Sequence, residues 1–169
     1  MTEPARGGGV VVSLDRQAEP DLPDLLLKAV PRTMVVIRDV VRGFVPSDRT
    51  ILHFRIVTLL LEQPRTTSEL AELTGAAPAN ISKAIAPMGR TKLVTRRHDP
   101  QDRRYVRIAL TAKGRAQAVA MLAAVRSEMT ERLQPLGRRE RQALAEALLL
   151  LARAFDPSRP TAAAKAQQI

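Results

Sequence analysis

Hydrophobic residues recur every three or four positions along most of the chain, which predicts a mainly helical protein. The first such stretch, residues 22–44, predicts a helix of about six turns. Asp21 is placed to cap its N-terminus. Pro31 lies in its interior, where proline removes a backbone hydrogen bond, and so predicts a bend or a break in the turn before it. A second apolar stripe, residues 51–60, predicts the next helix.

Two short helices joined by a tight turn are predicted next. Thr67 is placed to cap the first, Gly75 supplies the turn and Pro78 opens the second. Pro87 is expected either to end this second helix near residues 85–86 or to kink it. Paired short helices with such a turn are typical of a helix-turn-helix.

The apolar period then changes from helical to alternating, which indicates β-strands. Residues 93–97 and 105–110 alternate around a polar tip at residues 99–104, and this pattern predicts a hairpin. Thr111 then caps a long helix, and a last helix is expected at about residues 138–155. A hairpin directly after a helix-turn-helix is the wing of a winged helix-turn-helix.

The predicted fold class is mainly α with a small antiparallel β wing, a winged helix-turn-helix embedded in a helical dimerisation domain. The stripes at residues 22–44 and 144–155 carry more apolar surface than one chain of this size can bury, which predicts a homodimer. The expected division is a flexible tail (1–20), a helical dimerisation region (21–46 and 112–156), a winged helix-turn-helix (47–111) and a second flexible tail (157–169).

Positive charge is concentrated on the central part of the chain. The net charge is +10, and residues 65–115 hold eleven Lys and Arg against four acidic residues, a net charge of +7. A localised basic region is the footprint expected for a polyanion partner. Charge alone is equally compatible with a solvated charged face.

The composition argues against several other classes of protein. Cysteine is absent, and two distant histidines, His53 and His98, make a zinc site within one chain improbable, so no metal or cofactor is expected. No Gly-rich phosphate loop or nucleophile–base pair suggests an enzyme. No apolar run reaches the ~18 residues of a membrane span, and no secretory signal is evident, so a cytoplasmic, nucleoid-associated protein with no membrane partner is expected.

The second helix of the pair presents polar residues near its N-terminus. Asn80, Ser82 and Lys83 lie off its apolar face, where a recognition helix meets base edges in the major groove. The alternative is an ordinary short helix with a polar outer face. On the hairpin, Asp102 and Arg104 have the strand spacing that puts both side chains on one face, so the carboxylate can hold the arginine in position for the minor groove. The alternative there is an exposed charged hairpin.

The runs SELAELTGAAPANISKAI and LVTRRHDPQDRRYVRIALTAKG resemble the MarR family of bacterial winged helix-turn-helix transcriptional regulators. The resemblance covers about residues 22–155 and is most specific in DPQDRR followed by LTAKG. Two departures are Pro87 inside the recognition helix and Lys92, which stands where many members have glycine.

The resemblance implies a homodimeric repressor on a palindromic operator in double-stranded DNA, with a dimer interface made by the first and the last two helices. It implies that the recognition helix faces the major groove and that Arg104, oriented by Asp102, enters the minor groove. The full set of expected DNA contacts is Thr67, Ala77, Pro78, Ala79, Asn80, Ser82, Lys83, Arg97, Asp102, Arg103 and Arg104.

The resemblance also implies release from DNA by a small-molecule effector, which could be an anionic aromatic compound. Candidate ligand residues are Arg32, Arg38, His53 and Arg55, because a basic side chain in an apolar cleft suits an anion. Each of them could instead be solvated or paired. The alternative function is a non-sensing architectural or nucleoid-type DNA-binding protein with little sequence preference.

Overall fold

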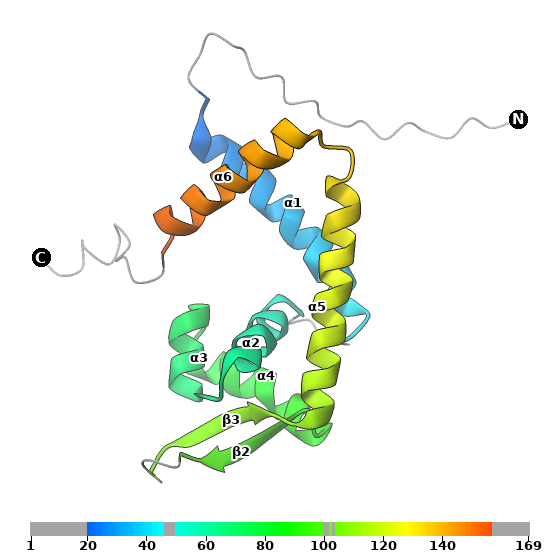
Figure 1. The fold of residues 1–169 in the computed structure, drawn as a ribbon. Helices are drawn as coiled ribbons and strands as arrows, with labels where there is room; N and C mark the ends of the chain where they lie inside the picture. Colours follow the sequence, from blue (N-terminus) through cyan, green and yellow to red (C-terminus); the bar gives the residue numbers. More distant parts are fainter. Residues whose placement is uncertain (1–19, 46–49, 100–101, 103, 157–169) are drawn as a thin grey trace, which may run out of the picture. The chain divides into compact units, whose positions relative to one another are not determined.

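The computed structural model describes residues 20–45, 50–99, 102 and 104–156. These residues are mainly helical with one small antiparallel sheet (Figure 1), which confirms the predicted fold class. The chain divides into two units, one ending at Val35 and one beginning at Val36. The two predicted tails lie outside the described residues, apart from Pro20.

Helix α1 (Leu22–Arg42) is continuous through Pro31, so of the predicted bend or break the break is wrong and the bend stays a prediction. Its start agrees with the sequence, because the Asp24 N–H donates to Asp21 Oδ1 at 3.1 Å. Pro31 deprives the carbonyl of Leu27 of its usual donor. Both residues are exposed, and a carbonyl on the solvent side of a helix can be hydrated, so the helix continues.

The second unit is built on one hydrophobic core. Helices α2 (Thr50–Glu62), α3 (Thr67–Thr74) and α4 (Pro78–Arg90) pack together beside the sheet and the start of helix α5 (Ala112–Leu133), as Figure 1 shows. Helix α6 (Arg138–Ala154) follows and has no buried residue. Four of these elements supply fully buried side chains: Ile56 and Leu60 from α2, Leu70 from α3, Ile81 and Met88 from α4, and Ile108 from β3.

The sheet has three strands in the order β1-β3-β2. Strands β2 (Val94–His98) and β3 (Val106–Leu110) form the predicted hairpin, with Arg97 opposite Arg107. Strand β1 (Arg65–Thr66) pairs with β3 on its other edge, and the sequence analysis missed it. Two residues are too few to show an alternating period, so pairing with a distant strand is what defines this one.

Two expectations about helix ends need correction. Helix α3 is capped by Thr66 and not by Thr67: the Thr66 hydroxyl accepts from the Glu69 N–H, and the Glu69 carboxylate accepts from the Thr66 N–H. Helix α4 does not end near residues 85–86, because it continues through Pro87 to Arg90. Pro87 is exposed, so water can satisfy the carbonyl that it leaves without a donor.

The turn between α4 and β2 is fastened to the start of α5. Lys92 has a left-handed backbone (φ 56°), and the Leu93 N–H closes the end of α4 by donating to the Met88 carbonyl at 2.8 Å. Thr111 caps α5 as predicted, and its hydroxyl also donates to the Lys92 carbonyl at 2.7 Å. Gly114 lies so close to this turn that a Cβ there would be 1.8 Å from the Leu93 carbonyl oxygen.

Candidate nucleic-acid interface

The turn between α3 and α4 sets the direction of the second helix. Gly75 ends α3 in the left-handed conformation (φ 67°), and its N–H donates to the Glu72 carbonyl. Only glycine adopts this backbone without a steric cost from Cβ. Pro78 then occupies the first turn of α4, where its missing N–H has no helical partner to lose. The two helices therefore form a helix-turn-helix.

Helix α4 has one buried and one exposed face. Its buried face consists of Ile81, Ala84, Ile85 and Met88. The predicted contact residues Ala77, Pro78, Ala79, Asn80, Ser82 and Lys83 are all exposed, whereas Thr67 at the start of α3 is half-buried. The predicted set on α4 therefore shares one solvent-facing surface. Small side chains at its N-terminus would let the backbone approach a groove closely.

On the wing, the structure brings Asp102 and Arg104 together. The Arg104 Nη2 lies 2.7 Å from Asp102 Oδ2, and its Nε and backbone N–H each donate to Oδ1 at 3.0 Å. These hydrogen bonds, the side-chain ones most, hold the pKa of the Asp102 carboxyl below its ordinary value of 3.8. The Arg104 side chain is nevertheless 87% exposed. The pair therefore presents an oriented cation to the solvent.

The remaining wing cations differ in their surroundings. Arg97 is exposed on β2. Arg103 lies outside the described residues. Arg107 is one of the eleven Lys and Arg of residues 65–115, but its guanidinium is occupied: it bonds to the Asp99 carboxylate and lies 3.5 Å from Glu69 Oε2. The net charge of +7 counted over residues 65–115 therefore overstates the positive charge available to a partner.

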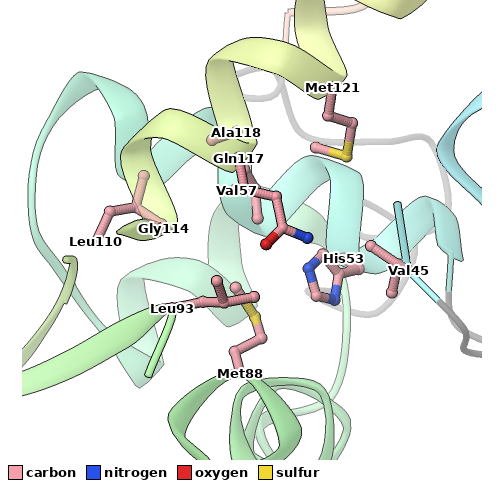
Figure 2. A pocket seen from close by; sticks show the side chains of 10 residues that line it. All are labelled: Val45, His53, Val57, Met88, Leu93, Leu110, Gly114, Gln117, Ala118 and Met121. Atoms are coloured by element: carbon pink, nitrogen blue, oxygen red, sulfur yellow. The ribbon is translucent and has the colours of Figure 1, made fainter. Parts of the chain in front are cut away.

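A small cavity lies beside His53 in the second unit. Figure 2 shows the imidazole of His53 among side chains from α4 and α5, with Met121 on one side and Met88 on the other. The cavity volume is about 10 Å³, which is room for about one water molecule. His53 is 8% exposed, and burial lowers its pKa below the ordinary value of 6.5. The imidazole is therefore neutral at neutral pH.

The other two candidate ligand residues of the second unit, Arg38 and Arg55, do not line this cavity. Arg55 donates to the carbonyls of Leu73 and Thr74 at 2.8 and 2.7 Å, so it caps the end of α3. Arg38 pairs with Asp39 on the same helix. Arg32 is exposed in the first unit. Gln117 on α5 does line the cavity, and no feature of its position in the sequence pointed to that.

Other kinds of site find no support in the described part of the chain. No group of three or more His, Asp or Glu side chains gathers there in a way that could hold a metal ion. Its helices include none long and apolar enough to cross a membrane.

Comparison with known proteins gives one family. Residues 47–104 match the family model described as the MarR family. A search of the curated proteins finds no match to the sequence.

Solved structures share the fold over most of the chain. RV1404 from Mycobacterium tuberculosis is 25% identical, with a TM-score of 0.70 over 86% of this chain and 99% of that one. The transcriptional repressor CouR, bound to a 23-mer DNA duplex, is 27% identical, with a TM-score of 0.63 over 78% of this chain and 92% of that one.

A third solved structure is described as showing a mechanism for regulation of DNA binding of Bordetella bronchiseptica BpsR by 6-hydroxynicotinic acid. It is 24% identical, with a TM-score of 0.59 over 78% of this chain and 92% of that one, and so shows the fold alone. The match over the helix-turn-helix and wing, together with this shared architecture, shows that the chain is similar to the MarR family of transcriptional regulators.

Proposed function

We propose that this chain is a repressor that binds a palindromic operator as a homodimer and leaves it when a small anionic aromatic ligand binds. The observation that carries the DNA-binding part is the pairing of two exposed features in one compact unit. One is the polar N-terminal face of α4, and the other is the Arg104 guanidinium held by Asp102. The similarity to CouR, whose structure is bound to a DNA duplex, also supports the DNA-binding part of the proposal.

In this proposal Asn80, Ser82 and Lys83 meet the major groove. Asn can pair bidentately with adenine, and Lys can address guanine or phosphate. Arg104 enters the minor groove. Thr67, Ala77, Pro78, Ala79, Arg97 and Arg103 complete the contact surface.

The homodimer is supported by apolar side chains that the single chain leaves in solvent. On α6 the exposed fractions of Leu148, Leu149 and Leu150 are 54%, 68% and 56%. On α1 the most exposed apolar side chains are Leu22 and Leu27. Monomeric proteins rarely leave apolar surface grouped in this way. A Leu149→Glu variant should sediment as a monomer where the unchanged protein sediments as a dimer.

The ligand part of the proposal rests on basic side chains beside apolar surface. Of the four candidates, Arg55 is already engaged with the end of α3, and His53 borders the cavity. Room for about one water cannot hold an aromatic ring, so a ligand at His53 must separate α5 from α4. Such a movement would disturb the recognition helix, which gives release from DNA a physical cause. Arg32 and Arg38 remain candidates for the charged end of the ligand.

Fluorescence anisotropy with the gene's own upstream DNA and a shuffled duplex tests DNA binding. We expect specific binding at least about a thousandfold tighter than non-specific binding, with an affinity that falls steeply as salt rises. Arg104→Ala should weaken specific binding by about tenfold, whereas Arg139→Ala, which removes the same charge from α6, should leave it unchanged. Equal affinity for both duplexes would favour the architectural alternative.

Release is tested by adding 6-hydroxynicotinate, an aromatic acid, to the protein–DNA complex, with nicotinamide as its uncharged counterpart. The acid should lower the fraction of DNA bound, and the amide should not. If neither the acid nor related aromatic acids changed DNA binding or raised the melting temperature, the ligand part would be refuted.

A further inference from the structure

Arg107 sits at the meeting point of three segments of the winged unit. It belongs to β3, the central strand of the sheet, where it lies opposite Thr66 of β1 and Arg97 of β2. Its Nε donates to the Asp99 carboxylate at the end of β2, and its Nη1 lies 3.5 Å from Glu69 of α3. The same Nη1 donates to the Pro64 carbonyl at 3.3 Å.

The burial of these groups differs from that of the Asp102–Arg104 pair. The Asp99 side chain is 9% exposed and that of Arg107 is 34% exposed, against 87% for Arg104. The hydrogen bond to Asp99, the largest cause, raises the pKa of Arg107 above its ordinary value. A guanidinium flanked by two carboxylates offers little net positive charge to a phosphate. Arg107 is therefore poorly placed to bind DNA itself.

The Glu69 carboxylate connects this cluster to the helix-turn-helix. Its Oε2 accepts the Thr66 N–H at 2.6 Å and so caps the N-terminus of α3. The guanidinium of Arg107 thus joins the base of the wing to the first helix of the helix-turn-helix. Arginine suits such a joint because its planar fork can address several acceptors in fixed directions, which a lysine ammonium cannot do.

We propose that Arg107 is a positioning residue that fixes the wing relative to the helix-turn-helix, so that Arg104 and the recognition helix reach neighbouring grooves together. Asp99 and Glu69 are its two anchors. The inference rests on the proposed DNA binding. It predicts that the two carboxylates of Asp99 and Glu69 increase the affinity for DNA, although DNA is itself a polyanion. Simple electrostatics gives the opposite sign, because removing a carboxylate near DNA reduces repulsion.

The proposal and simple electrostatics predict opposite changes in DNA affinity when the Glu69 charge is removed, so one measurement distinguishes them. Glu69→Gln keeps a side chain that can cap α3 but removes the charge that holds Arg107. Glu72→Gln removes the same charge from an exposed position on the same helix. Measured by anisotropy on the operator duplex, Glu69→Gln should bind more weakly than the unchanged protein, and Glu72→Gln equally or more tightly. Tighter binding by both variants would overturn the inference.

A second experiment tests whether Arg107 acts through Arg104. Arg107→Lys keeps the charge and loses the fork, so it should weaken binding by about tenfold. In an Arg104→Ala background the same change should cost much less, because the side chain that it positions is already gone. Equal fold-losses in both backgrounds, or an Arg107→Lys variant with unchanged affinity, would overturn the inference.

Two measurements separate this inference from its premises. Circular dichroism at the assay temperature confirms that each variant is folded, and Asp99→Asn offers a second way to release Arg107 if Arg107→Lys unfolds. Weaker DNA binding by Asp99→Asn, with a smaller loss of affinity in the Arg104→Ala background, would support the positioning role of Arg107. If the unchanged protein binds no duplex, the proposed function fails as well. If it binds and the variants behave additively, only the positioning role fails.

Discussion

Gly114→Ala should destabilise the protein, although helix propensity alone predicts the reverse. Gly114 lies in the first turn of α5, where alanine would normally contribute about 1 kcal/mol. Here the added Cβ would lie 1.8 Å from the Leu93 carbonyl oxygen, and real Cβ atoms essentially never come within 3.0 Å of another atom. The start of α5 and the turn after α4 would therefore have to separate by at least about 1 Å.

That separation acts on named contacts. The Thr111 N–H donates to the Leu93 carbonyl at 3.0 Å, and the Thr111 hydroxyl donates to the Lys92 carbonyl at 2.7 Å. Losing both costs about 2 kcal/mol, and strain from overpacking adds about 1–3 kcal/mol. After subtracting the gain in helix propensity, we expect the free energy of unfolding to fall by about 2–4 kcal/mol.

Urea unfolding followed by circular dichroism at fixed protein concentration measures this change. The matched control is Gly89→Ala, since Gly89 is also helical and a Cβ there meets no atom within 4 Å. The control should be as stable as the unchanged protein or up to about 1 kcal/mol more stable. A Gly114→Ala protein with an unchanged or higher urea midpoint would refute the steric reasoning.

Three further predictions concern the same unit. Lys92→Gly should raise the urea midpoint by relieving the left-handed backbone, a gain of about 0.5–1 kcal/mol, whereas Lys92→Ala keeps the strain and should give no such gain. Because burial lowers the pKa of His53, its contribution to stability is complete above about pH 6.5 and is lost as pH falls towards the folded pKa; unfolding titrations should show a shallower acid dependence for His53→Gln than for the unchanged protein. Arg55→Met should lower the free energy of unfolding by about 1 kcal/mol, because the last carbonyls of α3 lose their donor; an unchanged urea midpoint would contradict the capping role.

Local spacing of residues was enough to identify most of the elements. The periods of three to four and of two locate the helices and the hairpin within a residue or two, apart from the end of α4, because backbone hydrogen bonds and the burial of one face act over short stretches of chain. Capping residues behaved similarly: Asp21 and Thr111 each accept the N–H three positions later, as their placement predicted. The misplaced cap at Thr67 shows the limit, since Thr66 and Thr67 differ only in which of them has Glu69 three residues ahead.

At the two internal prolines the helices continue, although local propensity allows them to end there. Pro31 and Pro87 each remove one backbone hydrogen bond, and propensity alone predicts that the helix ends or bends there. Both lie on exposed faces, while Val41 on α1 and Met88 on α4 are buried further along. Burial of the helix after the proline stabilises it by more than the loss of one backbone hydrogen bond costs. The sequence alone does not show how much of that helix will be buried.

The partners of charged side chains were decided by the tertiary structure alone. Arg104 and Arg107 are both cations of one hairpin, yet the first is solvent-exposed and the second lies against carboxylates from two other segments. Asp102 is two residues from Arg104, so their pairing could be predicted. Glu69 is far from Arg107 along the chain, and its distance depends on how α3 packs against the sheet. Local contacts follow from spacing, whereas contacts between distant segments exist only after the core has brought those segments together.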